Sequence, residues 1–209
     1  MTEQAISPSA YFDVSFGAAL DYAGGGGAMQ LLDNLEPWRR LTRIALIGWL
    51  VFYGVFIAYA AADHSGFLFI DNANLVVHEG GHLLFGWFGA TLGLWGGTLL
   101  QWLAPALLAA YFFAQRQIAG FCFCLFMLFE NFLYTATYMA DARAQVLDLV
   151  SVGGGEATHD WFAIFSSLGV LQRDTQIAAT VRALGWIGML ATVAWFAWRG
   201  WTLDEPRAD

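Results

Sequence analysis

The sequence predicts an all-α, polytopic integral membrane protein with about five transmembrane helices. Three observations lead to this fold class. The 209-residue chain is 58% hydrophobic and only 12% charged, whereas soluble domains are about 45–50% apolar and about 25% charged. Its apolar residues fall into runs with few charges that are long enough to cross roughly 30 Å of hydrocarbon as helices. Lipid cannot hydrogen-bond exposed backbone groups, so helices are the expected spanning elements.

Five apolar runs are expected to cross the membrane within a membrane domain at residues 37–203. The expected spans are 44–62, 67–94, 99–115, 118–140 and 177–201. The segment before the first run, Trp38 to Arg43, contains an aromatic residue and three arginines, as is typical of a cytoplasmic membrane interface. We expect residues 1–36 to form a peripheral segment, 141–174 a polar loop, and 204–209 a C-terminal tail.

The charge of the chain limits its partners. The formal net charge is −8, and the nine basic residues, all arginine, are spread along the sequence. A nucleic-acid partner is not expected, because neutralising phosphates requires clustered positive charge. Membrane lipid is the expected environment, and the inner (plasma) membrane of a bacterium is the expected location. Cys122 and Cys124 lie two positions apart in an apolar run, which predicts buried free thiols and no disulfide.

The second run contains the motif HEGGH, His78 to His82, with apolar residues on both sides. Positions i and i+4 lie on one face of a helix, so His78 and His82 can bind a single metal ion. Glu79 lies about 100° around the helix from His78, close enough to act on a bound water without being a ligand. These are the mechanics of the HExxH motif of zinc peptidases. Ionisable side chains at membrane depth are costly if idle, which favours a functional role.

Neighbouring residues are expected to complete the face of this helix. Asn74 and Asp71 follow the same face toward the N-terminus, where either could accept a hydrogen bond from the non-ligating nitrogen of His78. Gly80 and Gly81 remove side chains beside the motif, so another backbone or a substrate strand could approach. Two imidazoles and one further nitrogen or oxygen ligand suit Zn²⁺.

A catalytic zinc needs a third protein ligand and leaves one position for water. Four residues are candidates, and the sequence leaves the choice between them open: Asp141, His159, Asp160 and Glu130. A polar stripe at helical spacing in the fourth run ends at the first of these candidates: Glu130, Tyr134, Thr137, Tyr138, Asp141. Its tyrosines are also candidates for stabilising a developing oxyanion.

At these residues the sequence resembles the intramembrane zinc metalloproteases of the site-2 protease type. The shared features are HEGGH in an apolar helix, the small-residue stretch GATLGLWGG (residues 89–97), and a third apolar segment with Pro105. The resemblance covers roughly residues 70–150. It implies that His78 and His82 bind zinc and that Glu79 is the general base. The family takes its third ligand from an aspartate in an LDG motif, and this chain has no LDG.

Two functions from different classes follow. The first is a zinc-dependent membrane hydrolase, a metallopeptidase in which Glu79 takes a proton from water and delivers it to the leaving amine. The resemblance implies a membrane-embedded peptide as its substrate. The alternative is a non-catalytic membrane protein with a structural metal site or an ion or proton pathway. Glu79 distinguishes the two, because turnover requires this carboxylate and metal binding does not.

Overall fold

The computed structural model describes residues 37–149 and 158–203. Within these ranges every regular element is helical, and no strand is present. The elements are α2 (Arg43–Ala62), α3 (Asp71–Gly86), α4 (Ala90–Ala114), α5 (Ile118–Ala140), α6 (Asp160–Ser167), the short 3₁₀ helix η2 (Leu171–Arg173) and α7 (Asp174–Thr202). The expected peripheral segment 1–36, the tail 204–209 and part of the polar loop, residues 150–157, lie outside the described residues.

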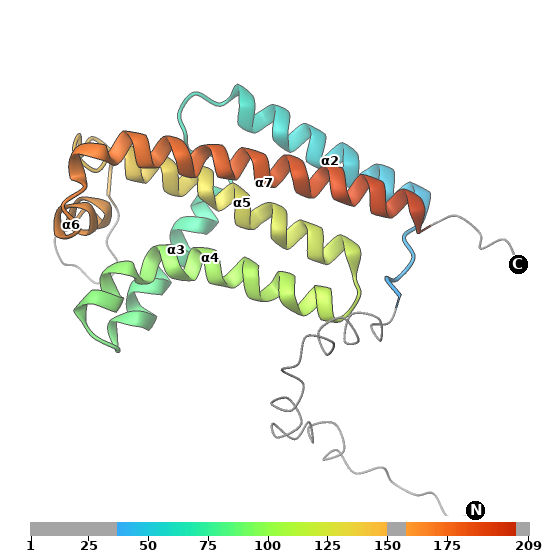
Figure 1. Ribbon diagram of the computed structural model, residues 1–209, viewed down its shortest axis with the longest axis horizontal. Coiled ribbons are helices and arrows are strands. Elements are labelled where there is room, and N and C mark those ends of the chain that lie inside the picture. The colour runs from blue at the N-terminus through green and yellow to red at the C-terminus, as the bar shows by residue number, and fades with distance from the viewer. Residues whose placement is uncertain (1–36, 150–157, 204–209) are drawn as a thin grey trace, which may run out of the picture. The chain divides into compact units, whose positions relative to one another are not determined.

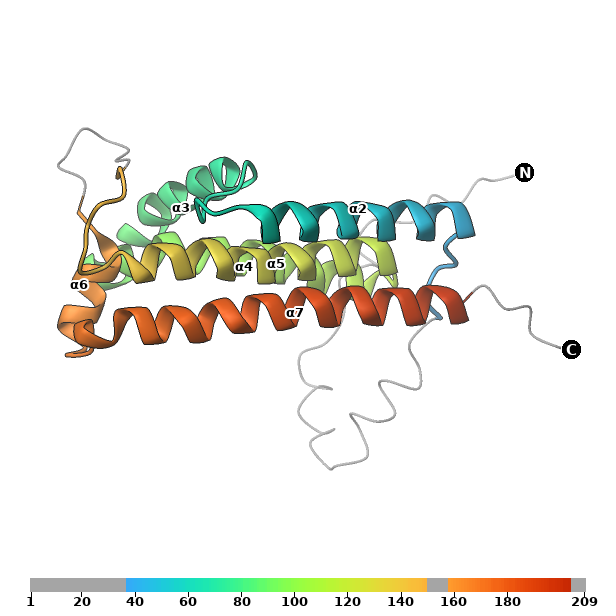
Figure 2. The ribbon, with the colours of Figure 1, turned by 90° about the horizontal axis from the view of Figure 1, so that it is seen from above.

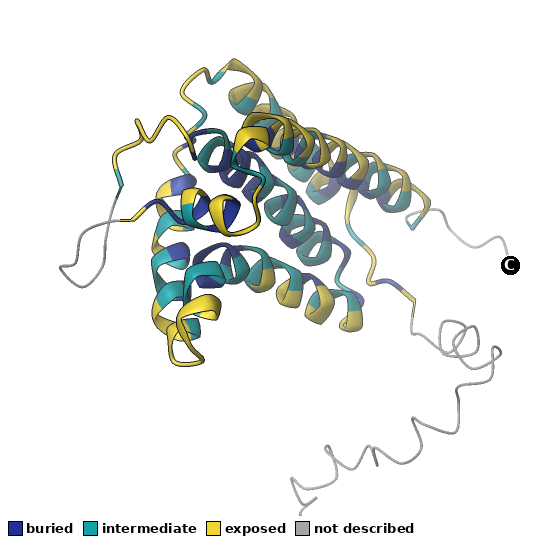
Figure 3. Ribbon diagram, turned by 60° about the vertical axis from the view of Figure 1, so that its left-hand side comes forward, coloured by how far each residue is buried: buried dark blue, intermediate teal, exposed yellow. Residues whose placement is uncertain are grey.

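Four of the described helices are long and apolar enough to cross a membrane. They are Arg43–Ala62, Ala90–Ala114, Ile118–Ala140 and the continuous segment Leu171–Thr202. Their outward faces are largely exposed (Figure 3). On α2 the apolar side chains of Ile44, Val51 and Val55 are each more than half exposed. Such surfaces need an apolar surrounding, so the helices indicate an integral membrane protein.

The expected span at residues 67–94 is not a single helix, so the described residues contain four candidate spans where five were expected. Helix α3 has 16 residues, which at 1.5 Å per residue measures about 24 Å and is shorter than the hydrocarbon core. The chain then turns at Gly89, whose φ of 112° is open to glycine alone without strain. Helix α4 starts directly afterwards, nine residues before the expected start of the third span at residue 99.

Helix α5 is the central element, packing against α7 on one side and α4 on the other (Figures 1 and 2). Two glycines of α7 permit its close approach to α5, because a Cβ at Gly188 would overlap the ring of Phe129, and one at Gly185 would lie 2.9 Å from the Phe129 carbonyl oxygen. Aromatic rings from three helices fill the main core, where Tyr53, Phe126 and Phe196 are fully buried. This packing leaves α3 and α6 together at one end of the long helices.

A second apolar cluster fixes helix α6 against the ends of α5 and α7. Its buried members are Met139, Ala142, Trp161, Ile164, Phe165 and Ala178. The ring of Trp161 also contacts Trp95 of α4, with 5.6 Å between the ring centroids. Burial of these side chains places the first residue of α6 beside the middle of α3, although the two helices are far apart in the sequence.

Candidate metal centre

Helices α3 and α4 touch backbone to backbone beside the HEGGH motif. A Cβ at Gly81 would lie 2.2 Å from the carbonyl oxygen of Gly96, and one at Gly96 would lie 2.5 Å from that of Gly81. Gly97 lies beneath the imidazole of His78, where a Cβ would be 2.5 Å from the ring. Gly80 has an open environment, with Leu100 Cδ2 as the nearest atom at 3.9 Å. The expected approach of another backbone therefore occurs at Gly81, and the approaching backbone is α4.

Three side chains converge on one point between α3 and α6. Nε2 of His78 and Nε2 of His82 are 3.0 Å apart. Oδ2 of Asp160 lies 3.0 Å from the first nitrogen and 3.1 Å from the second. His78 and Asp160 are buried and His82 is half-buried. This group could hold a metal ion.

The other nitrogen of each ring points at an oxygen. Nδ1 of His78 donates to Oε1 of Gln101 over 2.7 Å, and Nδ1 of His82 donates to the carbonyl oxygen of Gly93 over 2.7 Å. Because oxygen acceptors require N–H groups, both Nδ1 atoms carry a hydrogen, and both Nε2 atoms of the neutral rings present lone pairs. Two lone pairs and a carboxylate oxygen therefore face one another, which is an arrangement that a cation stabilises.

Asp160 owes its position to the start of helix α6. The preceding residue, His159, caps the helix by accepting a hydrogen bond from the backbone N–H of Phe162 at its Nδ1, over 3.2 Å. The hydroxyl of Tyr138 accepts a hydrogen bond from the backbone N–H of Asp160 over 3.0 Å and donates one to Oδ2 of Asp160 over 3.3 Å. Burial raises the pKa of Asp160, but the imidazoles of His78 and His82, which donate hydrogen bonds to it when they are protonated, outweigh this effect and hold that pKa at about 2. The side chain is a carboxylate at neutral pH, as metal binding requires.

The other candidate ligands in the loop have different contacts. Asp141 accepts the N–H of Val146 at Oδ1 and that of Leu147 at Oδ2, over 3.0 and 3.1 Å. Nε2 of His159 lies 3.3 Å from Oδ2 of Asp141. Burial lowers the pKa of His159, which favours the neutral ring that caps α6. Asp141 thus fixes the loop that follows α5, and His159 caps the start of α6.

Glu130, Asp71 and Asn74 form a separate buried group between α3 and α5. Nδ2 of Asn74 donates to Oδ1 of Asp71 over 2.8 Å and to Oε2 of Glu130 over 3.0 Å. Oδ2 of Asp71 accepts the N–H of Leu68. The expected hydrogen bond from His78 to Asn74 or Asp71 is thus replaced by the bond to Gln101. The sequence analysis assigned no role to Gln101. The only feature of the sequence that could have indicated one is that Gln101 is a polar residue inside an apolar run.

Glu79 faces a cavity of about 400 Å³ between α3, α5 and the loop. Within the described residues Glu79 has no hydrogen bond or ion pair. The cavity is lined by His78, Glu79, Tyr134, Tyr138 and apolar side chains that include Phe67, Leu75, Leu147 and Leu149. An apolar pocket with a few convergent polar groups is the usual form of a ligand site.

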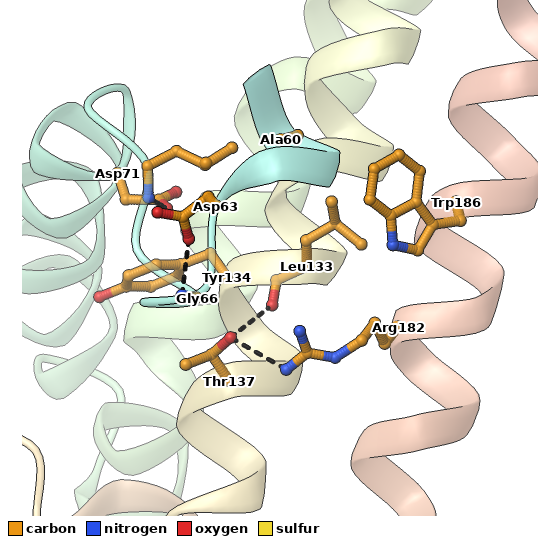
Figure 4. A pocket seen from close by; sticks show the side chains of 10 residues that line it. Ala60, Asp63, Gly66, Asp71, Leu133, Tyr134, Thr137, Arg182 and Trp186 are labelled. Atoms are coloured by element: carbon orange, nitrogen blue, oxygen red, sulfur yellow. Dashed lines mark hydrogen bonds between the residues drawn. The ribbon is translucent and has the colours of Figure 1, made fainter. Parts of the chain in front are cut away.

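A second, smaller cavity shares the lining residues Tyr134 and Thr137 with the larger one (Figure 4). Its volume is about 40 Å³, and Asp63, Asp71, Thr137 and Arg182 are among its lining residues. Arg182 donates to Oγ1 of Thr137 over 3.1 Å, and the N–H of Gly66 donates to Asp63 over 2.7 Å. The polar groups of this cavity are thus largely bonded to one another, in contrast to Glu79 in the larger one.

No protein-family model, no curated protein and no solved structure matches this chain. The functional interpretation therefore depends on the geometry of the metal centre and of the cavity beside it.

Proposed function

We propose that this protein is a zinc-dependent, membrane-embedded hydrolase, a metallopeptidase of the site-2 protease type in a bacterial inner membrane. The convergence of His78, His82 and Asp160 is the observation that carries the proposal. In a tetrahedral site with Zn–N distances of about 2.0–2.1 Å, neighbouring ligand atoms lie about 3.3 Å apart. The three separations here are 3.0, 3.0 and 3.1 Å. Three protein ligands with one open position characterise catalytic zinc.

The donor set supports Asp160 as the third ligand. Both oxygens of Asp141 accept backbone N–H groups, and Nδ1 of His159 caps α6. Asp160 alone among the four candidates points an oxygen at both histidine Nε2 atoms. A bound zinc ion supplies Lewis-acid chemistry, because it acidifies water and polarises a carbonyl oxygen.

The remaining residues have roles that follow from their positions. Glu79 is the general base, which takes a proton from water and delivers it to the leaving amine. Its carboxylate is unpaired within the described residues and borders the 400 Å³ cavity. The hydroxyl of Tyr138 donates its one hydrogen to Oδ2 of Asp160 over 3.3 Å and so orients that carboxylate. Tyr134, which lines the cavity, is the tyrosine left to donate to a developing oxyanion. The apolar cavity would receive the side chains of a membrane-embedded peptide beside the scissile bond.

The test compares Glu79→Gln with Asp148→Asn, because both substitutions remove one negative charge from the lining of the same cavity. The proteins are purified in detergent, and cleavage of labelled casein and of a labelled single-span apolar peptide is measured beside zinc content. We expect Glu79→Gln to keep its zinc and to lose cleavage by about 10²–10⁴-fold, while Asp148→Asn retains both. Unchanged cleavage in Glu79→Gln, or wild-type protein that holds zinc and cleaves neither probe, would contradict the proposal.

One observation favours the second candidate, a non-catalytic ion or proton pathway. Glu130 is fully buried in α5, and its Oε1 has no hydrogen-bond partner among the described residues. Idle carboxylates at membrane depth are costly. A pathway predicts that Glu130→Gln abolishes proton or metal-ion flux into vesicles, whereas the hydrolase predicts no flux in the wild type.

A further inference from the structure

A buried chain of side-chain amides connects the metal ligand His78 to helix α5. Nδ1 of His78 bonds to Oε1 of Gln101 over 2.7 Å. Nε2 of Gln101 donates to Oδ1 of Asn131 over 3.4 Å, and Nδ2 of Asn131 donates to the carbonyl oxygen of Met127 over 2.9 Å. Gln101 and Asn131 are 2% and 4% exposed, so both side chains are shielded from bulk water. The chain thus crosses from α3 through α4 to α5.

The backbone of α5 fixes the direction of the whole chain. The carbonyl oxygen of Met127 has no hydrogen to donate, so the NH₂ group of Asn131 must face it. The amide oxygen of Asn131 then faces Gln101 and requires the NH₂ group of that residue. Oε1 of Gln101 is left for His78, whose Nδ1 must be the donor. Each amide therefore has a single orientation that leaves no like groups facing each other.

We infer that Gln101 and Asn131 are positioning residues that hold His78 in the tautomer able to bind metal. This inference rests on the proposed metal site. With Nδ1 protonated, Nε2 presents its lone pair toward Asp160 and His82. If the amide of Gln101 turned over, its NH₂ group would face Nδ1, and the hydrogen of the neutral ring would move to Nε2. That atom would then be blocked as a ligand.

The two histidines differ in how their tautomers are fixed. His82 bonds to the carbonyl oxygen of Gly93, which is part of the backbone and cannot turn over. His78 depends on an amide whose orientation is set by a second amide on another helix. The centre is therefore sensitive to Asn131, although no hydrogen bond joins this residue to a metal ligand.

The experiment measures the Kd of the full-length protein for Zn²⁺ in detergent, by competition with a chromophoric chelator. The variants are Gln101→Leu, Asn131→Leu, their combination and Gln101→Glu. Thr135→Val is the matched control, because it removes the bond from Trp102 Nε1 to Thr135 Oγ1 (3.2 Å), which also joins α4 to α5 at a buried position. His78→Ala identifies binding at this site, and circular dichroism confirms that each variant is folded.

We expect Gln101→Leu to weaken zinc binding by about 10–100-fold, which is the usual effect of removing the partner of a metal-bound histidine. Asn131→Leu should also weaken zinc binding. The Kd of the double variant should lie within about threefold of the Kd of Gln101→Leu, because both substitutions act through the His78 ring. Gln101→Glu should bind zinc more tightly than Gln101→Leu, since its carboxylate still accepts a hydrogen bond from Nδ1–H although it cannot donate to Asn131 Oδ1.

Three results would overturn the inference while leaving the metal site intact. These are wild-type affinity in Gln101→Leu, a loss in Thr135→Val equal to that in Asn131→Leu, and zinc binding by a folded Gln101→Glu protein that is no tighter than that of Gln101→Leu. Failure of the proposed metal site differs from all three, because the wild type would then bind no zinc that His78→Ala abolishes, and failure of the proposed hydrolase alone would leave zinc binding and all four expected affinities unchanged.

Discussion

Substituting alanine for Gly97 tests whether α4 holds the His78 ring at the metal centre. A Cβ at this position would lie 2.5 Å from Cε1 and Nε2 of His78. Ordinary van der Waals contact starts at 3.4 Å, so the ring would have to move by roughly 0.9 Å, whereas a metal–ligand distance tolerates about 0.2 Å. Helix α4 cannot retreat from α3, because it also packs against α5. The ring therefore leaves its place as a ligand.

The size of the effect follows from this displacement. Losing only the hydrogen-bond partner of a metal-bound histidine lowers metal affinity by about 10–100-fold. Moving the ligand itself should cost at least the upper end of that range. We expect Gly97→Ala to raise the Kd for Zn²⁺ by about a hundredfold, which corresponds to about 2.8 kcal/mol.

The assay is zinc binding by chelator competition on detergent-purified protein, with helical content measured by circular dichroism. Gly80→Ala is the control, because a Cβ there would meet only Leu100 Cδ2 at 3.9 Å; its zinc affinity should equal that of the wild type. A Gly97→Ala protein that is fully helical and binds zinc as tightly as the wild type would refute the reasoning. It would mean that His78 is not held against α4 at a metal site.

Three further predictions concern the third ligand, the pH dependence and the ion pair that joins the loop after α5 to the start of α7. Asp160→Ala should lose its zinc by elemental analysis, whereas Asp141→Asn should retain it; the reverse pattern would make Asp141 the ligand. Hydrogen bonding to Asp160 raises the pKa of His82 against the opposing effect of burial. Protonated His82 therefore stabilises the metal-free protein below its unfolded pKa of about 6.5 and ceases to do so as pH rises through the folded value. Because zinc needs the neutral ring, the gain in melting temperature on adding zinc should grow from about pH 6 to about pH 8, and a constant gain would contradict this account. Arg143 contacts the buried Asp174 through two atoms, at 2.7 and 2.8 Å. Arg143→Leu should lower the melting temperature without changing zinc affinity; a thermal melt identical to that of the wild type would show that the pair contributes nothing.

The membrane character and the histidine pair were predictable from the sequence because both depend on local patterns. Long runs without charge specify helices in lipid whatever their neighbours are. Helical spacing alone brings the rings of His78 and His82 together, and their Nε2 atoms are 3.0 Å apart in the structure. The break at Gly89 was not predicted, because the small residues that follow it look like a connection. They are helical because Gly96 and Gly97 are the contact surface of α4 for α3.

The sequence narrows the third ligand, beside His78 and His82, to four candidate residues, but it does not decide between them. His159 and Asp160 are adjacent and equally suited to bind metal, and sequence separation carries no information on distance. The choice is made by helix α6, which uses the His159 ring as its cap and so turns the next side chain toward α3. Gln101 was missed for a similar reason, because its role depends on the packing of α4 between α3 and α5.

The bonds around the centre also determine the side from which a substrate could approach it. On the α4 side, both imidazoles are fixed by Gln101 and the Gly93 carbonyl, and glycine contacts close the space between α3 and α4. On the α6 side, Asp160 and the Tyr138 hydroxyl occupy the ligand face. The remaining side faces α5, where Glu79 borders the 400 Å³ cavity and α3 makes few contacts because it packs mainly on α4. A peptide strand that reached the metal would therefore enter between α3 and α5, with Glu79 beside the scissile bond and the walls of the cavity around its apolar side chains.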